Sequence, residues 1–218
     1  MFSGPMVRAI LQGRKTVTRR PVKVQPRSKG DIGSYGLGQP FIRHPDPTKR
    51  NPECPYGRPG DRLWVRETWY CDHLEVQKGP YLKPNDLDLF EAREDGTLVY
   101  AADGLTPYEA EQPTWKPSIH MPRWASRILL EVTDVRVERL QDIGEQQALA
   151  EGIVGVDFRP DDGFPICRGY MVGPDDGSTP LETHASKAFA GLWRSINGPD
   201  SWDGNPWVWV VEFKRVEQ

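Results

Sequence analysis

The stretch ASRILLEVTDVRVERL, residues 125–140, decides the fold that the sequence predicts. Apolar and polar side chains alternate along most of it, so it predicts one long strand or a bent pair of strands. The stretch that follows, DIGEQQALAEG at 142–152, predicts a short helix, because Asp142 and Glu145 have the spacing of a capping box and Gly152 supplies a stop. A strand followed at once by a helix therefore stands at the centre of the predicted fold.

Other strands are predicted on both sides of this centre. PWVWVVEFKRV (206–216) is a run of aromatic and β-branched residues near the C-terminus. GRPGDRLWVRETW (57–69) begins with a Pro-Gly-Asp turn and then alternates. KTVTRRPV (15–22) is β-branched and ends near Pro21, and TLVYAAD (97–103) predicts a short strand. Strands spread along the whole chain, with few helices between them, predict an α+β fold built on a small β-barrel with a few flanking helices.

Two further helices are predicted, one near each end of the chain. Ser3 can cap a helix that runs through MVRAILQG (6–13), Pro5 suits its first turn and Gly13 can close it. The segment THASKAFAGLWRSING (183–198) carries large apolar residues at helical intervals, namely Phe189, Leu192, Trp193 and Ile196. Three polar, Gly- and Pro-rich stretches, at about 24–58, 71–122 and 153–181, lack a clean period, so we expect long loop insertions there in one domain spanning 1–218.

Composition narrows the class of protein. The chain has 218 residues, 37% of them hydrophobic, with 21 glycines, 21 prolines and eight tryptophans, as expected for a folded core surrounded by many loops. Its three cysteines, an odd number without a regular framework, favour a reduced cytoplasmic setting over a disulfide scaffold. No apolar run is long enough to cross a bilayer, so we expect a soluble protein with no membrane partner.

Metal and cofactor motifs are weak in this sequence. Cys54, Cys71 and His73 are the closest grouping of soft ligands, but their spacing matches no zinc motif. A phosphate-cradling glycine loop and a G-x-S-x-G elbow are also missing. We therefore predict no metal and no cofactor.

Basic residues gather at the front of an otherwise slightly acidic chain. The net charge is -3, yet residues 1–30 contain no Asp or Glu, and Arg14, Lys15, Arg19 and Arg20 stand around the two threonines of GRKTVTRR (13–20). Such a cluster is typical of a wall that meets phosphate. Because the whole chain is acidic, a small or local ligand is favoured over long nonspecific duplex binding.

Four stretches taken together resemble the ASCH domain, a member of the PUA-like β-barrel superfamily, in the enlarged form met in phage and prophage proteins. They are ILQGRKTVTRR (10–20), GRPGDRLWVRETW (57–69), LLEVTDVRVERLQDIGEQQALAEGI (129–153) and the closing LWRSINGP with NPWVWVVEFKRV. These stretches cover roughly half the chain, and the three insertions have no counterpart. The resemblance implies a cleft on the barrel that binds RNA or a nucleoside.

The small enzymes of this family remove the acetyl group from N(4)-acetylcytidine. They use a lysine and a threonine of the GRKTxT element and a glutamate of the later helix, which fall on Lys15, Thr18 and Glu151. Other members are described as ribonucleases, and many have no assigned activity. The resemblance therefore implies an amidohydrolase acting on an N-acylated cytidine, and it leaves open a non-catalytic module that binds RNA or a modified base, or a metal-independent ribonuclease.

The chemistry of this triad is consistent with its residue types. A threonine hydroxyl can attack an amide if a neutral lysine takes its proton, which requires the lysine pKa to fall through burial or through neighbouring cations such as Arg14, Arg19 and Arg20. Glu151 would oppose that shift, so a proton relay or the orientation of the substrate amine suits it better. In a regular strand Lys15 and Thr18 face opposite sides, so both reach one cleft only if the turn after Gly13 extends through Lys15 or Thr16.

A second candidate group lies in WVRETW (64–69). Alternation places Glu67 on the buried face, where a carboxylate needs a partner; it could pair with an N-terminal arginine and line the cleft, or form a structural ion pair. Trp64 and Trp69 could stack on a base, and Arg66 could bind nucleic acid beside them. The expected partner is a nucleoside or single-stranded RNA, and the oligomeric state stays open.

Overall fold

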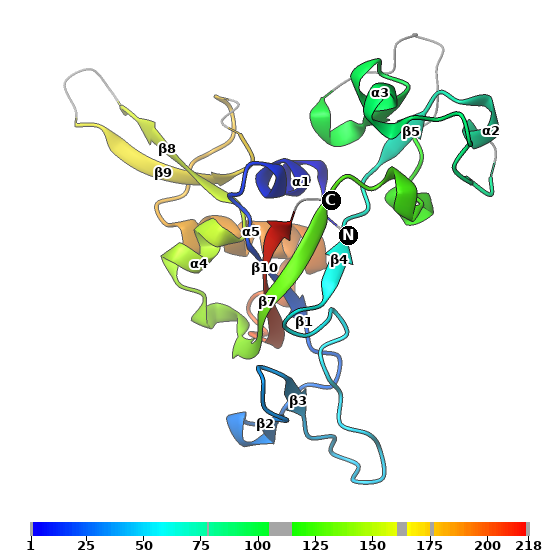
Figure 1. The fold of residues 1–218 in the computed structure, drawn as a ribbon. Coiled ribbons are helices and arrows are strands. Elements are labelled where there is room, and N and C mark those ends of the chain that lie inside the picture. The colour runs from blue at the N-terminus through cyan, green and yellow to red at the C-terminus, as the bar shows by residue number, and fades with distance from the viewer. Residues whose placement is uncertain (1, 78, 105–114, 161–164, 175–176, 217–218) are drawn as a thin grey trace.

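A four-stranded antiparallel sheet forms the centre of the protein in a computed structural model that describes residues 2–77, 79–104, 115–160, 165–174 and 177–216 (Figure 1). The strand order is β1-β10-β7-β4. Their bounds are Val17–Pro21 for β1, Trp207–Val216 for β10, Leu129–Arg139 for β7 and Arg62–Trp64 for β4. The sheet curls into a half-barrel, and the register shifts between Glu212 and Phe213 on β10, where such an irregularity increases the local bend.

The two central strands explain the apolar composition of the C-terminal segment. On β10, Val208 and Val210 pack on one face with Val17 and two helices, whereas Trp209 and Val211 pack on the other face with residues of β7. Because both faces are covered, the strand has a nearly continuous hydrophobic run and not an alternating one. The mixed α and β class with a barrel-like sheet is thereby confirmed.

Three α-helices surround the sheet: α1 (Gly4–Leu11), α4 (Glu145–Ala150) and α5 (Ala185–Asn197). Helix α1 packs against the inner face near Phe213, and α4 and α5 pack against the outer face. Ser3 is the N-cap residue of α1, as predicted, although its side chain makes no capping bond. Ile196, expected on the apolar face of α5, is 59% exposed.

The start of α4 differs from the sequence expectation. Its N-cap is Gly144, whereas Asp142 lies in a preceding 3-10 turn, so the predicted Asp142–Glu145 capping box is wrong. Instead, the Gly144 N–H donates to Gln147 Oε1 at 3.4 Å. Glu145 accepts from the backbone N–H groups of Ala185 and Ser186, at 2.7 and 3.3 Å, and thereby caps α5 in place of its own helix.

Three arms project from the half-barrel (Figure 1). The first arm, residues 24–58, contains β2 (Ile32–Ser34) and β3 (Pro40–Ile42). The second arm, residues 69–125, contains β5 (Trp69–Cys71), β6 (Leu98–Tyr100), α2 (Leu74–Gln77) and α3 (Leu89–Glu94). The third arm, residues 153–181, contains β8 (Ile153–Phe158) and β9 (Cys167–Val172). Short 3-10 helices lie at Lys29–Asp31, Ala101–Asp103, Ser118–His120, Arg123–Ala125, Leu140–Asp142 and Pro199–Ser201.

The arms hold more regular structure than the sequence predicted. The second arm has an apolar core of its own around Trp69, Leu98 and Met121. In the third arm, β8 and β9 pair antiparallel from Ile153 to Phe158, where a long loop was expected. The parts of these insertions at 78, 105–114, 161–164 and 175–176 lie outside the described residues. Among the described helices, none has both the length and the apolar character needed to cross a membrane.

Candidate functional site

A pocket of about 420 Å³ lies along β1, at the edge of the sheet that has no further strand. It is bounded by β1, the N-terminal helix, the end of α4 and one side of α5. The lining residues include Phe2, Met6, Lys15, Thr18, Arg19, Arg20, Glu151, Phe189, Trp193, Ile196 and Asn197. The structure thus brings Lys15, Thr18 and Glu151 together in one pocket.

The connection between α1 and β1 explains how Lys15 and Thr18 can share a pocket. Gly13 has a φ of +71°, and the N–H groups of Arg14 and Lys15 both donate to the carbonyl of Ala9, at 2.8 and 3.0 Å. The turn that closes α1 therefore includes Lys15, and β1 begins only at Val17. Because Lys15 lies in the turn and not in the strand, strand alternation does not place it on the side opposite Thr18. The turn after Gly13 thus extends through Lys15, as a shared cleft requires.

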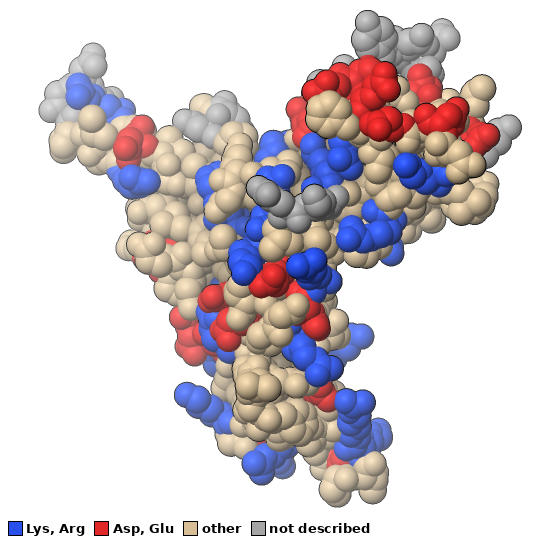
Figure 2. All heavy atoms as spheres, in the orientation of Figure 1, with Lys and Arg blue, Asp and Glu red and all other residues tan. Residues whose placement is uncertain are grey.

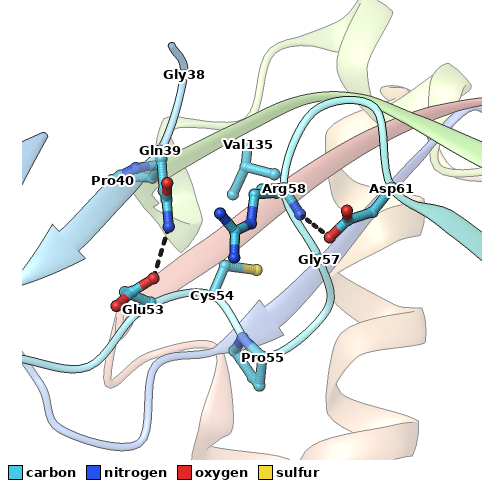
Figure 3. A pocket seen from close by; sticks show the side chains of 10 residues that line it. All are labelled: Gly38, Gln39, Pro40, Glu53, Cys54, Pro55, Gly57, Arg58, Asp61 and Val135. Carbon is cyan, nitrogen blue, oxygen red and sulfur yellow. Dashed lines mark hydrogen bonds between the residues drawn. The ribbon is translucent and has the colours of Figure 1, made fainter. Parts of the chain in front are cut away.

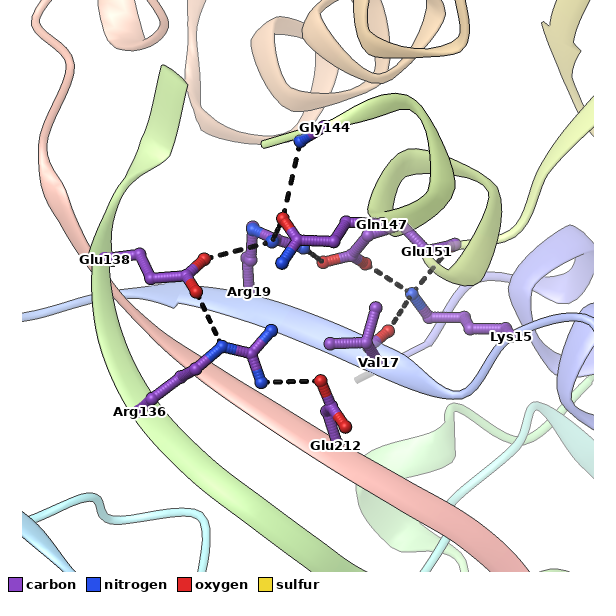
Figure 4. A network of polar contacts seen from close by, with 9 residues as sticks. All are labelled: Lys15, Val17, Arg19, Arg136, Glu138, Gly144, Gln147, Glu151 and Glu212. Carbon is purple, nitrogen blue, oxygen red and sulfur yellow. Dashed lines mark hydrogen bonds and ion pairs between the residues drawn. The ribbon is translucent and has the colours of Figure 1, made fainter. Parts of the chain in front are cut away.

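Lys15 is held by three acceptors. Its Nζ donates to Glu151 Oε2 at 2.6 Å, to the Glu151 carbonyl at 2.8 Å and to the Val17 carbonyl at 2.8 Å (Figure 4). The two residues are only 4% and 3% exposed. Gly152, next to Glu151, has a φ of +101°, which favours glycine, and a Cβ there would lie only 3.3 Å from the Cβ of Ala9.

The pKa of Lys15 is lowered from its ordinary value of 10.5, chiefly because burial disfavours the ammonium form. The carboxylate of Glu151 opposes this effect, while the positive charges of Arg20 and Arg19 add to it. Burial and cations together therefore favour a neutral amine at this position, as a base would need.

Arg19 extends the buried polar network behind the pocket. Its guanidinium donates to Glu151 Oε1 at 3.3 Å, to Gln147 Oε1 at 2.7 Å and to Glu138 Oε2 at 3.3 Å. Glu138 also accepts from Arg136 at 2.6 Å, so the chain of charges continues across β7 (Figure 4). Arg19 is thus engaged by protein acceptors and braces Glu151 from the side opposite Lys15.

The free edge of β1 also presents backbone groups. Phe213 N donates to the Thr16 carbonyl at 2.8 Å, and Val22 N donates to the Trp207 carbonyl at 3.0 Å. Peptide groups alternate in direction along a strand, so the even-numbered residues of β1 bond to β10 and the N–H of Arg19 faces the open edge. The Val17 carbonyl, which faces the same way, accepts from Lys15 Nζ.

Thr18 and Arg20 lie one strand position from Arg19 and face the other side of β1. The Thr18 hydroxyl has no hydrogen-bond partner in the described part of the chain, and no hydrogen bond joins it to Lys15 there. The Arg20 guanidinium lies over the ring of Phe2, 5.8 Å from its centroid. The Thr18 hydroxyl therefore lies in the pocket and makes no hydrogen bond to the described part of the chain.

The remaining predicted residues divide into two groups. Trp64 and Arg66 line an adjoining cavity with Thr18 and Arg20. Arg14 bonds to Gln12, at 2.7 and 2.9 Å, and does not line the pocket. Trp69 is fully buried in the second arm, where it packs edge-on against Trp124, so it has no open face for a base.

Glu67 is buried as predicted, but its partner is not an N-terminal arginine. Arg127 donates to both of its carboxylate oxygens, at 3.1 and 2.9 Å, and also binds Asp103. Neither cavity beside β1 is lined by Glu67 or Arg127. The suggestion that Glu67 lines the cleft is therefore wrong, and its place fits the structural ion pair that was the alternative.

Sequence reasoning missed the wall of the pocket that α5 supplies. Phe189, Trp193, Ile196 and Asn197 line it, and the exposed Ile196 on an otherwise well-packed helix stripe is the feature that marks this wall. Gln147 and Glu138 were also missed as partners of Arg19. In the sequence, Glu138 and Gln147 are only two polar residues, one on the predicted strand and one on the predicted helix, and no pattern links them to Arg19.

A smaller cavity of about 250 Å³ lies where the first arm meets β7 (Figure 3). Gln39, Glu53, Cys54 and Arg58 line it, and Gln39 Nε2 donates to Glu53 Oε2 at 2.6 Å. Cys71 is buried in the core of the second arm, far along the fold from Cys54, so the weak metal grouping noted in the sequence is not assembled. Within the described residues, no group of three His, Cys, Asp or Glu side chains is placed to hold a metal ion.

No protein-family model matches this chain, and comparisons with curated proteins and with solved structures give no match either. What the pocket can do therefore follows from its own residues.

Proposed function

We propose that the pocket along β1 is the active site of an amidohydrolase that removes an N-acyl group from a modified cytidine. The observation that carries this proposal is the buried Lys15–Glu151 contact of 2.6 Å in a pocket that also contains Thr18. A buried lysine whose pKa is lowered, beside an unengaged hydroxyl, is the combination that a Ser–Lys type of hydrolase requires. The resemblance to ASCH enzymes at the same three positions supports the choice of substrate.

The reaction would proceed in two halves. Thr18 Oγ attacks the acyl carbonyl carbon while its proton passes to neutral Lys15 Nζ, and the carbonyl electron pair moves to oxygen. The backbone N–H of Arg19, which faces the open edge of β1, and the guanidinium of Arg20, which lines the pocket, could stabilise this oxyanion. Collapse breaks the C–N bond, and the cytosine N4 takes the proton from Lys15. Water then hydrolyses the Thr18 ester and releases the carboxylic acid.

Glu151 fits a relay role in this scheme. A neutral amine has only two N–H donors, whereas three acceptors surround Lys15 Nζ. A neutral Lys15 would therefore leave one of these three acceptors without its donor. Glu151 Oε2, at 2.6 Å, is the side-chain acceptor close enough to exchange a proton with the amine as the leaving nitrogen needs one.

One observation favours a second candidate, a module that binds a modified base without turning it over. All three acceptors of Lys15 belong to the protein, and no hydrogen bond joins Lys15 to Thr18 in the described residues. A lysine fixed in this way would brace the pocket, and the pocket would only bind its ligand. For the amidohydrolase, ligand entry must move Lys15 Nζ toward Thr18.

The deciding experiment is a chromatographic assay of N(4)-acetylcytidine with the wild type, Thr18→Val and Thr16→Val. Valine keeps the shape of threonine and removes the hydroxyl, and Thr16 is an exposed neighbour outside the pocket. We expect cytidine and acetate in equal amounts from the wild type and from Thr16→Val, and a loss of roughly a thousandfold in Thr18→Val.

Failure of the folded wild type to form cytidine would overturn the amidohydrolase. Calorimetric binding of N(4)-acetylcytidine without product would then support the binding module. Cleavage of a labelled single strand in the presence of EDTA, with no deacetylation, would instead support the ribonuclease that the resemblance leaves open.

A further inference from the structure

A second cavity of about 370 Å³ adjoins the pocket along β1. The two share three lining residues, Phe2, Thr18 and Arg20. Thr18 and Arg20 thus stand at the junction, with Lys15 and Glu151 on one side of it and Trp64 and Arg66 on the other. A ligand that occupies both spaces must pass over the proposed nucleophile.

The second cavity lies inside the curl of the half-barrel. Its apolar floor comes from the inner faces of three strands and the segment after β4: Leu63, Val65, Leu130, Val211 and Phe213. Strands β1 and β4 are the two edges of the sheet and do not pair with each other in the described structure. The cavity is the space left open between these edges, where a closed barrel would have packed side chains.

Two of the arms supply the rim. Pro55 and Tyr56 come from the first arm, and Ile119 comes from the second arm. Tyr56 is 37% exposed and Trp64 is half-buried, so both present aromatic surface at the opening. The stretches that have no counterpart in the ASCH resemblance therefore shape this cavity, whereas the pocket with Lys15 is built without them.

The charge around the second cavity is positive. Arg20 and Arg66 line it, and no carboxylate does so among the described residues. Arg66 lies over the Trp64 ring at 4.6 Å and donates to the Ile119 carbonyl at 2.9 Å, while Arg123 lies over the same ring at 5.8 Å. Held against an indole in this way, the guanidinium of Arg66 stays at the cavity and keeps further N–H groups that can bind a ligand.

Many exposed acidic residues lie away from the second cavity. Figure 2 shows one group of them on the end of the second arm, over α3, where Asp88, Glu91, Glu94 and Asp95 are exposed. The net charge of -3 therefore does not describe the field at the second cavity.

We propose that the substrate is a short single strand and not a free nucleoside, with the acylated cytosine beside Lys15 and the adjacent base in the second cavity. Two adjoining cavities that share Arg20 match two bases linked by a phosphate: the aromatic and apolar side chains of each cavity contact a base, and Arg20 meets the bridging phosphate. The identity of the first base rests on the proposed function. The base must be unpaired to enter, so the strand is single.

The test compares N(4)-acetylcytidine with dinucleotides that carry it at the 5′ or the 3′ position. We expect kcat/KM for one dinucleotide to exceed that for the nucleoside by at least about tenfold. Tyr56→Ala and Arg66→Gln should lower the ratio of kcat/KM for that dinucleotide to kcat/KM for the nucleoside toward one, and the matched controls should leave this ratio unchanged. Matched controls are Tyr35→Ala and Arg43→Gln, because both residues are exposed on the first arm and line neither cavity.

Each outcome bears on a different claim. Equal kcat/KM for nucleoside and both dinucleotides would overturn the second subsite and leave the amidohydrolase standing. If nothing is turned over, the amidohydrolase fails, and the subsite is then tested by fluorescence anisotropy of a labelled cytidine tetranucleotide. Salt-dependent binding that Arg66→Gln weakens and Arg43→Gln does not would support the subsite, and an absence of binding would overturn it.

Discussion

Lys15 Nζ and Glu151 Oε2 lie 2.6 Å apart although 136 residues separate them in the chain. Their contact joins the turn after α1 to the end of α4, and both side chains are almost fully buried. Arg19 contacts the other oxygen of the same carboxylate at 3.3 Å, so one carboxylate neutralises two cations inside the fold. These buried ion pairs therefore also hold the fold together, so the effect of a substitution on protein stability must be measured separately from its effect on activity.

Glu151→Gln should destabilise the protein strongly. The change leaves buried Lys15 without a countercharge and leaves Arg19 with Glu138 as its remaining carboxylate, and breaking a buried pair by removing one partner costs about 3–5 kcal/mol. We expect a fall of that size in the free energy of unfolding, measured by denaturant titration. The double variant Glu151→Gln, Lys15→Met should recover part of it, because the ammonium group left without a carboxylate is gone.

The surface pair Lys214–Glu131 is the matched control for this measurement. Its atoms are 2.9 Å apart, but the lysine side chain is 60% exposed. Water and salt screen such a pair, so Glu131→Gln should cost only about 0–1 kcal/mol. If Glu131→Gln and Glu151→Gln lowered the free energy of unfolding equally, the buried contacts of Glu151 with Lys15 and Arg19 would not be formed as described.

The sequence singled out Lys15 and Glu151, but it did not show why they are in contact. The motif GRKT and the glycine after Glu151 are both local signals, and Gly13 and Gly152 do take the left-handed backbone that glycine allows. The contact between them depends on how α1 and α4 pack at the edge of β1, which no local pattern contains. Arg19 illustrates the same limit: its charge suggested phosphate, whereas the fold surrounds it with Gln147, Glu138 and Glu151.

The stability of the wild type relative to Lys15→Met should increase as the pH rises toward 10.5. The pKa of Lys15 is below 10.5 in the folded protein because of burial, with Glu151 opposing and Arg20 and Arg19 adding to the shift. Between the folded and unfolded pKa values the unfolded chain binds more protons, so the free energy of unfolding rises with pH through this window. At pH values below this window, the folded protein carries the full free-energy cost of burying the Lys15 ammonium group.

The comparison with Lys15→Met is needed because other groups titrate in the same range. Burial raises the pKa of Cys54 and Cys71 to about 11 and that of Tyr70 to about 12. These shifts make stability fall as the pH rises, and they are common to both variants. A difference between wild type and Lys15→Met that stays constant from pH 6 to pH 10.5 would contradict a lowered pKa for Lys15.

Arg127→Met should destabilise the protein without affecting the site. Glu67 is 1% exposed and would be left without its partner, which costs about 3–5 kcal/mol. Arg127 also lies 4.0 Å from the centre of the Tyr100 ring, so packing is lost as well. Because neither residue lines the cavities, kcat/KM per folded molecule should not change.

Adding Glu67→Gln to Arg127→Met should restore part of the stability, since the uncompensated carboxylate is removed. Arg62→Met is the control, because Arg62 is exposed on β4. If Arg127→Met lowered kcat/KM while the free energy of unfolding stayed unchanged, the Glu67–Arg127 pair would contribute to the site. That result would favour the sequence-based hypothesis that Glu67 lines the cleft.

The arms mark the second limit of sequence reasoning. The sequence marked three interrupted stretches, because Gly, Pro and polar residues break the periodic pattern there. The core of the second arm was missed, because Trp69, Leu98 and Met121 are far apart in the chain and no single window shows them as one group. The rim that Tyr56 and Ile119 supply to the second cavity was missed for the same reason.

The three cysteines should react with iodoacetamide in a fixed order. Cys71 is completely buried, and Cys54 lines the cavity beside β7 with its pKa raised to about 11 by burial. Cys167 is partly exposed on the third arm. At pH 8 a thiol with a pKa of about 11 is ionised in only about one molecule in a thousand, and the thiolate is the nucleophile. Cys167 should therefore be labelled first and Cys71 last, as followed by peptide mass spectrometry.

The pH dependence separates burial from ionisation in this experiment. Cys54 is reachable from its cavity, so its labelling rate should rise about tenfold for each pH unit between 8 and 10, while the protein stays folded. Cys71 should stay unlabelled over that range and react only when denaturant unfolds the second arm, because its core excludes the reagent. In denaturant all three thiols should react at similar rates. Labelling of Cys71 in the folded protein as fast as Cys167 would mean that the core of the second arm does not form.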